Sequence, residues 1–345
     1  MAKRVLITGA AGFVGANLSR RLLRDGHDLH LLVSRRTPAW RIDPIRSEVR
    51  VYDVDLRDGE TVARVVRAIR PEWVFHLAAY GAYPSQTALH RMVQTNIVGT
   101  INLVEAYLRT GWEAFVNTGS SSEYGFKDHA ASERELLEPN SHYAVTKASA
   151  TLFCRYTARS RGVHLPTLRL YSVYGPFEEP GRLIPTLALD GLEGKLPPLV
   201  SPDVARDYVC VEDVTDAYLL AAARTAQEPG AIYNVGTGVQ TPLREVVALA
   251  RRVLGIPVEP AWGSMPPRQW DTPVWVSDAR RIRDDLGWRP RYTLEAGFRL
   301  TVKWFQDNRH LHRLYRAGQC RSAEASHGRG EVWVSFSGRA AEHFP

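Results

Sequence analysis

The residues best suited to proton transfer in this sequence are a phenol and an ammonium, Tyr143 and Lys147, placed four residues apart. In a helix this spacing puts both side chains on one face. A free tyrosine, with a pKa of about 10, is a poor base at neutral pH. A neighbouring lysine cation favours the phenolate and lowers that pKa. We therefore expect Tyr143 to exchange a proton with a substrate hydroxyl, as general base or general acid.

A glycine cluster lies near the N-terminus, where Gly9, Gly12 and Gly15 follow an apolar strand expected at residues 3–8. Glycines in such a turn let backbone N–H groups approach a pyrophosphate, which then lies at a helix N-terminus. The order strand, glycine turn, helix predicts that this loop binds a dinucleotide. We include Phe13 and Val14, which open the helix, in the expected binding loop.

The end of the second expected strand, residues 28–33, distinguishes between two nicotinamide coenzymes. A carboxylate there binds the ribose 2′-hydroxyl of NAD, whereas arginine accommodates the 2′-phosphate of NADP. This chain has Ser34, Arg35 and Arg36 at that point and no carboxylate. We therefore favour NADP, with Arg35 or Arg36 binding the 2′-phosphate and Ser34 assisting. The alternative is a solvated basic loop with NAD bound.

The scaffold for these groups follows from apolar strands that alternate with helical segments. Strands are expected at 3–8, 28–33, 51–54, 73–78, 114–118 and 165–170, and helices at 18–24, 61–69, 92–110 and 142–161. This alternation predicts an α/β Rossmann fold with a doubly wound parallel sheet. After Pro176, helices expected at 183–192, 214–225 and 243–254 are separated by Pro- and Gly-rich loops, which predicts a smaller C-terminal substrate lobe.

We accordingly expect a dinucleotide domain at residues 1–176, with returning segments from the C-terminal half, and a substrate lobe at 177–310. Residues 318–345 are rich in Gly, Ser, Ala and Arg, and we expect a loosely ordered tail there.

The composition excludes several classes of protein. With 345 residues, 44% of them hydrophobic and 23% charged, the chain has ordinary globular usage. Its apolar runs are far shorter than the roughly 20 residues that span a bilayer, so we expect no membrane segment. The net charge of +7 is scattered, which argues against a nucleic-acid partner. Three widely spaced cysteines suggest neither disulfides nor a metal site and favour the cytoplasm.

In this order, the motifs resemble the extended branch of the short-chain dehydrogenase/reductase superfamily, the nucleotide-sugar NAD(P)-dependent epimerase/dehydratase family. The likeness covers about residues 3–308 and includes five further segments. They are Asp55-Leu56, His76 to Ala79, Thr118 to Gly125, Arg169 to Pro176 and Asn234 to Gly238.

The resemblance implies a set of coenzyme contacts. Asp55 and Leu56 would contact the adenine, Lys147 would hold the nicotinamide ribose, and the strand end after His76 would lie against the coenzyme. The residues expected at that strand end are Leu77, Ala78 and Ala79. Asn96 belongs to the family's structural asparagine motif, and we count it among the coenzyme-site residues.

The resemblance also implies a nucleoside-diphosphate sugar as substrate. Ser120 occupies the family's catalytic Ser/Thr position and would hold the reacting sugar oxygen against Tyr143. Arg206 would bind the diphosphate, for which a forked guanidinium is well suited. Ser121, Ser122, Ser172 and Leu199 are the other expected substrate contacts. Relatives dimerise through the helices expected here at 92–110 and 142–161, so we expect a homodimer.

The residues after Ser120 separate reactions within the family. Its 4,6-dehydratases have Asp and Glu there as acid and base, whereas this chain has Ser121 and Ser122, which disfavours elimination. Glu123, one position later, is interpreted as a structural or substrate-contacting carboxylate. We favour an NDP-4-keto-(6-deoxy)sugar 4-reductase, with an NDP-sugar 4-epimerase that retains its coenzyme as the alternative. A 4,6-dehydratase or a non-catalytic NADPH-binding protein ranks lower.

Overall fold

The centre of the molecule is a seven-stranded sheet whose strand order is β10-β6-β5-β4-β1-β2-β3, with every neighbouring pair parallel. The computed structural model describes residues 2–35, 37–83, 85–224, 228–267 and 271–318. The strands are β1 (Arg4–Thr8), β2 (Asp28–Val33), β3 (Arg50–Asp53), β4 (Trp73–His76), β5 (Ala114–Ser120), β6 (Thr167–Leu170) and β10 (Ile232–Val235). The expected doubly wound Rossmann fold is confirmed. Apart from residue 318, the expected tail lies outside the described residues.

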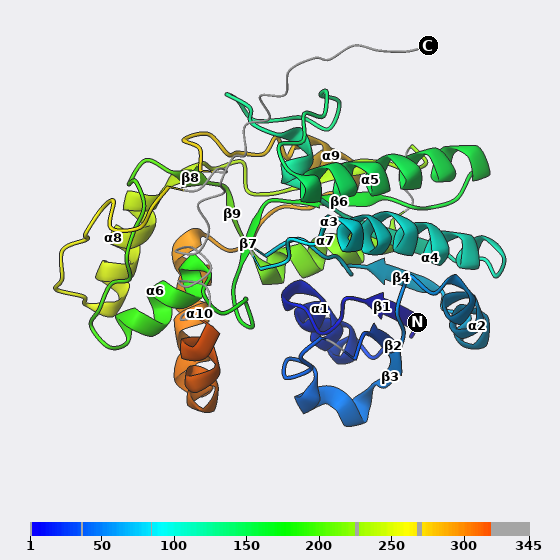
Figure 1. Cartoon of the computed structure of the whole chain (residues 1–345), viewed down its shortest axis with the longest axis horizontal. Helices are drawn as coiled ribbons and strands as arrows, with labels where there is room; N and C mark the ends of the chain where they lie inside the picture. Colours follow the sequence, from blue (N-terminus) through cyan, green and yellow to red (C-terminus); the bar gives the residue numbers. More distant parts are fainter. Residues whose placement is uncertain (1, 36, 84, 225–227, 268–270, 319–345) are drawn as a thin grey trace, which may run out of the picture.

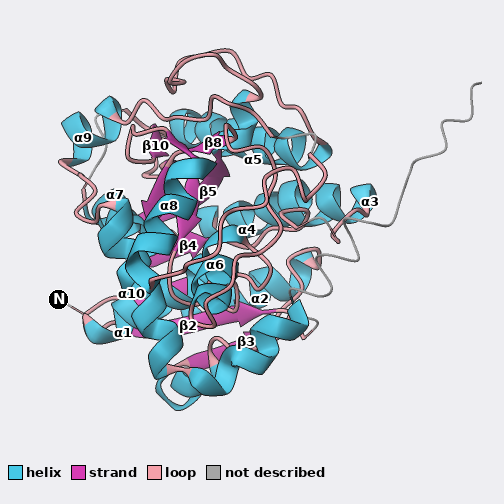
Figure 2. Ribbon diagram, turned by 90° about the vertical axis from the view of Figure 1, so that its left-hand side faces the viewer, coloured by secondary structure: helices cyan, strands magenta, loops and turns pink. Residues whose placement is uncertain are grey.

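Helices cover both faces of this sheet (Figure 2). One face carries α1 (Phe13–Arg24) and α7 (Val211–Ala223), and the other carries α2 (Gly59–Ile69), α4 (Gly99–Leu108) and α5 (His142–Arg161). Side chains of a strand alternate between these faces. In β1, Val5 and Ile7 accordingly enter the core beneath α1, whereas Leu6 enters the core beneath α2 and α4.

The helix that precedes β5 is less regular than its sequence suggests. It begins as α3 (Leu89–Met92), passes through the π-helical segment η2 (Val93–Val98) and continues as α4. The wider π turn lies at Asn96, one of the expected site residues, and such turns are common at functional sites. By contrast, α5 begins after Ser141, whose hydroxyl accepts a hydrogen bond from Ala144 N. It ends at Gly162, which has a positive φ of 64°.

A second lobe lies beside the sheet, at the left of Figure 1. It contains α6 (Leu183–Gly191), α8 (Leu243–Leu254) and α10 (Leu294–Asp307), which share a separate hydrophobic core. Two small sheets, β7 (Ser172–Tyr174) with β9 (Tyr208–Cys210) and β8 (Ala205–Arg206) with β11 (Thr241–Pro242), complete the strands. The remaining short elements are η1 (Asp43–Glu48), η3 (Ser121–Tyr124), α9 (Arg280–Leu286) and η4 (Arg309–Leu311).

Two segments from the C-terminal half return to the first domain. Strand β10 extends the main sheet beside β6, and α7 packs on α1. Within the described ranges, no helix has the length and apolar character needed to cross a membrane. The same residues hold no group of three or more His, Cys, Asp or Glu side chains placed to bind a metal ion.

Candidate active site

The carboxyl ends of the parallel strands lie along one edge of the sheet, which is where doubly wound folds bind their ligands. At this edge His76, the last residue of β4, ties three elements together. Its Nδ1 lies 2.7 Å from Thr8 Oγ1 and its Nε2 lies 2.9 Å from Thr100 Oγ1. Burial, with the charge of Lys147, lowers the pKa of His76 to about 3. This imidazole is therefore a neutral structural group.

The glycine loop connects β1 with α1 and lies against the end of β4. Gly9 has φ +70°, and a Cβ at Gly9 would lie only 2.6 Å from Ala78 N. The N-cap of α1, Gly12, supplies no side-chain hydrogen bond to the first turn of the helix. Backbone amides at this helix N-terminus are thus left for an anion. The loop fits a coenzyme diphosphate, with the strand-end residues Leu77 and Ala78 beside it.

Ser120 and Tyr143 meet although 23 positions separate them in the chain. Ser120 ends β5 and Tyr143 is the second residue of α5, and the side chain of Ser120 is near enough to act to lower the pKa of the tyrosine. Burial is the larger effect and raises the pKa of Tyr143 to about 12. In the protein alone, desolvation of the phenol dominates, and the expected lowering of this pKa by Lys147 together with a positive nicotinamide stays a prediction.

Lys147 lies one turn beyond Tyr143 on α5 and is only 4% exposed. Its burial lowers the pKa of the ammonium, which the charge of Glu123 partly offsets. No hydrogen bond or ion pair joins Nζ to another residue in the described part of the chain. A buried cation without such a partner is suited to binding a ligand oxygen.

Glu123 is completely buried behind Ser120. Its Oε1 accepts hydrogen bonds from Ser120 N at 2.8 Å and Thr151 Oγ1 at 3.0 Å, and its Oε2 pairs with Arg169 Nε at 2.8 Å. Both oxygens are occupied by protein groups. Of the two interpretations of this carboxylate, the structural one holds and the substrate-contacting one does not.

The ion pair continues into a buried polar network that explains two of the sequence motifs. Arg169 donates to Tyr124 Oη at 2.8 Å, and Tyr124 donates to Asn234 Oδ1 at 2.7 Å. Asn234 N in turn donates to Glu133 Oε1 at 2.8 Å. These residues join η3, β6 and β10 beneath the site, so the motifs around Tyr124 and Asn234 hold the scaffold.

Two of the expected coenzyme contacts have other roles. Asn96 accepts from Tyr80 N and donates to Tyr80 O and Thr146 Oγ1, so its amide holds the loop after β4 on α5. Leu56 is buried in the core beneath α2. Their side chains are therefore engaged in the protein, and their expected contacts with the coenzyme stay predictions. Asp55 is exposed and pairs with Arg57, and Ala79 is half-buried after β4.

The basic segment after β2 has an acidic neighbour that its own sequence does not contain. The Arg35 backbone N donates to Asp53 Oδ1 at 3.0 Å, and the Arg35 guanidinium forms an ion pair with the same carboxylate. Asp53 comes from the end of the adjacent strand, β3. Ser34 accepts a hydrogen bond from Thr37 N. Arg36 lies outside the described residues.

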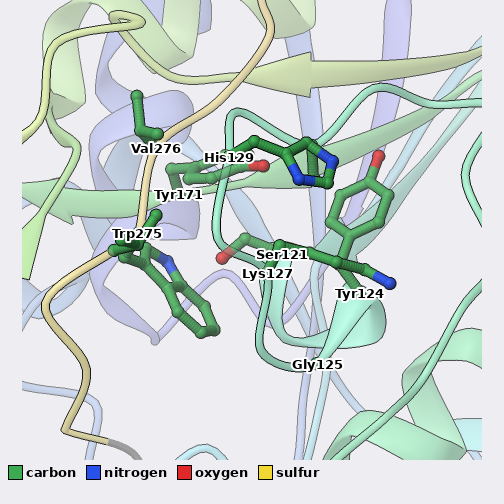
Figure 3. Close-up of a pocket in the computed structure, with 10 residues that line it drawn as sticks. Ser121, Tyr124, Gly125, Lys127, His129, Tyr171, Trp275 and Val276 are labelled. Carbon is green, nitrogen blue, oxygen red and sulfur yellow. The ribbon is translucent and has the colours of Figure 1, made fainter.

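The expected substrate residues Ser121 and Arg206 lie near Trp275. Ser121 lines a small pocket together with Tyr171 and Trp275 (Figure 3). Arg206 lies 5.5 Å from the Trp275 ring centroid and donates to Asp271 Oδ1 at 3.4 Å. Ser122 bonds to Ser120 through their hydroxyls at 2.8 Å. Ser172, which opens β7, is half-buried.

Leu199 does not line the site with its side chain. It is 1% exposed and packs in the core of the second lobe. The side chain thus fills the interior of the second lobe, and the expected contact of Leu199 with the substrate stays a prediction.

Several polar residues at the site were not predicted. The charges of Tyr83 and Arg182 act on Tyr143, which places them in its neighbourhood. Arg41 is buried, donates to Phe177 O at 2.8 Å and pairs with Glu179 Oε2 at 2.6 Å. No local pattern distinguishes these residues from surface arginines and tyrosines, since only the folded loops bring them to the sheet edge.

Comparison with known proteins identifies the family. A profile described as "NAD dependent epimerase/dehydratase family" matches residues 5–236. The chain belongs to this family. It is 31% identical to a dTDP-glucose 4,6-dehydratase of Neisseria meningitidis, covering 89% of this chain and 94% of the relative. It is 32% identical to a UDP-glucose 4-epimerase of Mycolicibacterium smegmatis, and the match covers 88% of this chain and 99% of the relative. The crystal structure of the Thermus thermophilus UDP-glucose 4-epimerase with NAD is also similar, with a TM-score of 0.78 at 31% identity. This match covers 88% of this chain and 99% of the chain in that structure.

Proposed function

We propose that this family member transfers hydride at C4 of a nucleoside-diphosphate sugar, with Tyr143 exchanging the proton of the C4 oxygen. The observation that carries the proposal is the grouping of Ser120, Tyr143 and Lys147 at the sheet edge, beside a glycine loop that fits a dinucleotide. The similar dehydratase and epimerase are both named for NDP-glucose substrates, which supports this substrate class.

Ser120, Tyr143 and Lys147 each have a separate role in the proposed reaction. When bound, the coenzyme supplies the chemistry of accepting or donating a hydride. Ser120 holds the C4 oxygen by a hydrogen bond, and Tyr143 gives a proton to that oxygen during reduction or removes it during oxidation. Lys147 binds hydroxyl oxygens of the coenzyme ribose. Because burial raises the pKa of Tyr143 to about 12, the free enzyme carries a neutral phenol ready to donate.

The net reaction that we place first is reduction of an NDP-4-keto-(6-deoxy)sugar. Reduction needs a proton donor at the C4 oxygen, and the neutral phenol of Tyr143 can supply that proton. Dehydration is not supported, because Ser121 and Ser122 occupy the positions of the acid and base and Glu123 is committed to Arg169. The segment 32–36, which lacks a carboxylate, supports NADP for this reaction.

The second candidate is an NDP-sugar 4-epimerase that retains its coenzyme. The similarity to UDP-glucose 4-epimerases over 88% of this chain favours it. So do two observations on the coenzyme: the T. thermophilus enzyme was solved with NAD, and Asp53 neutralises Arg35. Ser120, Tyr143 and Lys147 would serve oxidation followed by reduction from the other face equally well.

We also propose a homodimer in which two copies of α5 meet. Three large apolar side chains on one face of α5 are exposed, namely Val145, Leu152 and Tyr156. Exposed apolar faces of this kind mark protein interfaces. We further place the protein in the cytoplasm, since Cys154 and Cys210 are free thiols and the proposed coenzymes and substrates are cytoplasmic metabolites.

The decisive experiment follows NAD(P)H absorbance and sugar products for the purified protein. NADPH consumed in step with a new C4 alcohol from an NDP-4-keto-6-deoxysugar supports the reductase. Conversion of UDP-glucose into its C4 epimer without net change in coenzyme supports the epimerase. If neither substrate class turns over while the protein binds NAD or NADP, the proposed function is wrong.

A further inference from the structure

Asp207 is a fully buried carboxylate between β8 and β9 that accepts hydrogen bonds on both of its oxygens. Its Oδ1 accepts from Thr237 N at 2.7 Å and from Thr237 Oγ1 at 2.6 Å. Its Oδ2 accepts from Gly238 N at 3.0 Å, Ser277 N at 3.1 Å and Ser277 Oγ at 2.5 Å. No lysine or arginine pairs with it in the described part of the chain, so neutral donors alone compensate for the burial of its charge.

These donors belong to two segments that are far apart in the sequence. One is the turn 236–240 between β10 and β11, and the other is the segment 271–277, which we call the strap. The turn approaches the carboxylate so closely that a Cβ at Gly236 would lie 2.6 Å from Asp207 Oδ2. This close approach explains the glycine at that place in the motif Asn234 to Gly238. Asp207 therefore fixes the end of the strap to the turn.

The strap carries two residues that contact the guanidinium of Arg206. Asp271 Oδ1 accepts from Arg206 Nη2 at 3.4 Å, and the Trp275 ring centroid lies 5.5 Å from Arg206 Cζ. Trp275 also lines the pocket that contains Ser121 (Figure 3). The side chain of Arg206 stays 18% exposed, so a ligand can reach it. The direction in which this guanidinium points thus depends on where the strap lies.

We propose that Asp207 is a positioning residue that holds the guanidinium of Arg206 in place for the diphosphate of the NDP-sugar. The inference rests on the proposed function and on the expected role of Arg206 at that diphosphate. Asp207 acts through the strap, because it binds Ser277 at one end while Asp271 and Trp275 contact the guanidinium. A side chain that is fixed before the ligand arrives loses less freedom on binding, so the ligand binds more tightly. Asp207 itself is buried and does not contact the ligand.

Asp207→Asn tests this role with little change in side-chain shape. An amide has one acceptor oxygen and carries an N–H₂ donor in place of the second oxygen. In either orientation this N–H₂ faces a backbone N–H, either that of Thr237 or those of Gly238 and Ser277. We expect Kd for UDP-glucose to rise about tenfold, the effect of weakening one hydrogen bond to a charged group. Kd for NADH and NADPH should stay unchanged, because the glycine loop lies between β1 and α1.

A double-variant cycle distinguishes positioning from a general loss of stability. Arg206→Gln removes the guanidinium and should raise Kd for UDP-glucose by about 10–100-fold. Because Asp207 acts through Arg206, adding Asp207→Asn to Arg206→Gln should raise Kd by less than about twofold further. The matched control is Asp213→Asn, since Asp213 is a buried carboxylate of α7 that accepts from Arg291 N at 2.9 Å and Tyr292 N at 3.1 Å. It should lower the free energy of unfolding without raising Kd.

Calorimetry with UDP-glucose and dTDP-glucose, and fluorescence titration with NADH and NADPH, measure the Kd values. A rise for Asp207→Asn that disappears in the Arg206→Gln background supports the inference. If Asp207→Asn binds both sugars as the wild type does, if Arg206→Gln has no effect, or if the two effects add fully, the inference is overturned and the proposed function stands. If the wild type binds neither NDP-sugar, both are overturned.

A milder variant keeps the inference testable should Asp207→Asn fail to fold. Ser277→Ala removes only the hydroxyl that the strap donates to Asp207 Oδ2. We expect it to raise Kd for UDP-glucose by about threefold, and this rise should also disappear in the Arg206→Gln background. An unchanged Kd in Ser277→Ala would then overturn the inference.

Discussion

Glu123 and Arg169 form an ion pair in which both side chains are essentially inaccessible to solvent, with Oε2 and Nε 2.8 Å apart. The same carboxylate accepts the backbone N–H of Ser120, so the pair fixes the end of β5 from behind. A charged group at this depth is tolerated because both of its oxygens accept hydrogen bonds from protein donors. The serine that would hold the substrate oxygen is thereby oriented by a residue that never meets the substrate.

Removal of one partner of this pair is expected to destabilise the protein strongly. Arg169→Leu leaves Glu123 buried and unpaired, and the free energy of unfolding should fall by about 3–5 kcal/mol. Urea unfolding followed by circular dichroism measures it. The double variant Glu123→Gln with Arg169→Leu leaves no charge behind and should lose less than the sum of the single variants. Equal stability of Arg169→Leu and the wild type would refute the structural role.

The role of Tyr143 predicts a loss of turnover without a loss of coenzyme. Tyr143→Phe removes only the proton donor, and kcat should fall by about 10²–10⁴-fold while Kd for NAD(P)H stays the same. Steady-state kinetics and fluorescence titration measure the two quantities. Tyr52→Phe is a suitable control, because the phenol of Tyr52 bonds to His30 and lies at the opposite end of the sheet. Activity retained in Tyr143→Phe would mean that another group moves the proton.

His76 makes the stability of the protein depend on pH. Its pKa is lowered to about 3 in the folded state, so the unfolded chain binds a proton that the folded chain does not between this value and about 6.5. Stability is therefore fully present above about pH 6.5 and is lost on acidification, by about 1.4 kcal/mol per unit at most. His76→Asn should remove this part of the slope. If the free energy of unfolding falls equally in wild type and variant between pH 7 and pH 4, the prediction is contradicted.

The strands and helices of the dinucleotide domain could be predicted because each has a strong local pattern. The runs around Val5 and Phe75 are apolar on both faces, and α5 is bounded by Ser141 and Gly162. The helix expected at 18–24 begins earlier, at Phe13, because the glycine turn rather than hydrophobic periodicity marks its start. Strand β10 was not predicted, since its four residues become a strand only through parallel pairing with β6.

The site was predictable where chemistry and spacing coincide, and not where tertiary contacts decide. Ser120, Tyr143 and the glycine loop stand out by residue type and order along the chain. The ion pair between Arg35, which follows β2, and Asp53, which ends β3, depends on how the strands are ordered in the sheet. The burial of Leu199 depends on the packing of the second lobe. Glu178, in the loop between β7 and α6, carries no local sign that its carboxyl is buried or that one oxygen, Oε2, lacks a hydrogen-bond partner in the described part of the chain. Such properties belong to the assembled loops rather than to any segment.

The pairing of Arg35 with Asp53 predicts how coenzyme preference can be shifted. Asp53→Asn releases the guanidinium for a 2′-phosphate and removes a charge that repels it. We expect the ratio of Kd for NADPH to that for NADH to fall several-fold, in keeping with the roughly 0–1 kcal/mol of an exposed ion pair. Arg35→Gln should move the ratio the other way. If neither variant changes the ratio, residues other than Arg35 and Asp53 determine the preference between the 2′-phosphate and the 2′-hydroxyl of the coenzyme.

The exposed face of α5 predicts the oligomeric state. Leu152 is 53% exposed between Val145 and Tyr156, and in a dimer through this face each side chain would meet its copy or a neighbour of it. Leu152→Glu places a charge where water is excluded, which should weaken dimerisation by about 100-fold or more. Light scattering coupled to gel filtration over a range of concentrations measures it.

The matched control is Val258→Glu. Val258 is similarly exposed but follows α8 in the second lobe, so its replacement should leave the dimer intact. A monomeric wild type at high concentration would exclude the proposed interface. A dimer that survives Leu152→Glu but not Val258→Glu would place the interface on the second lobe. Because α5 also carries Tyr143 and Lys147, a dimer through α5 would brace the helix that presents the catalytic pair. Monomeric Leu152→Glu should therefore lose kcat as well as its partner.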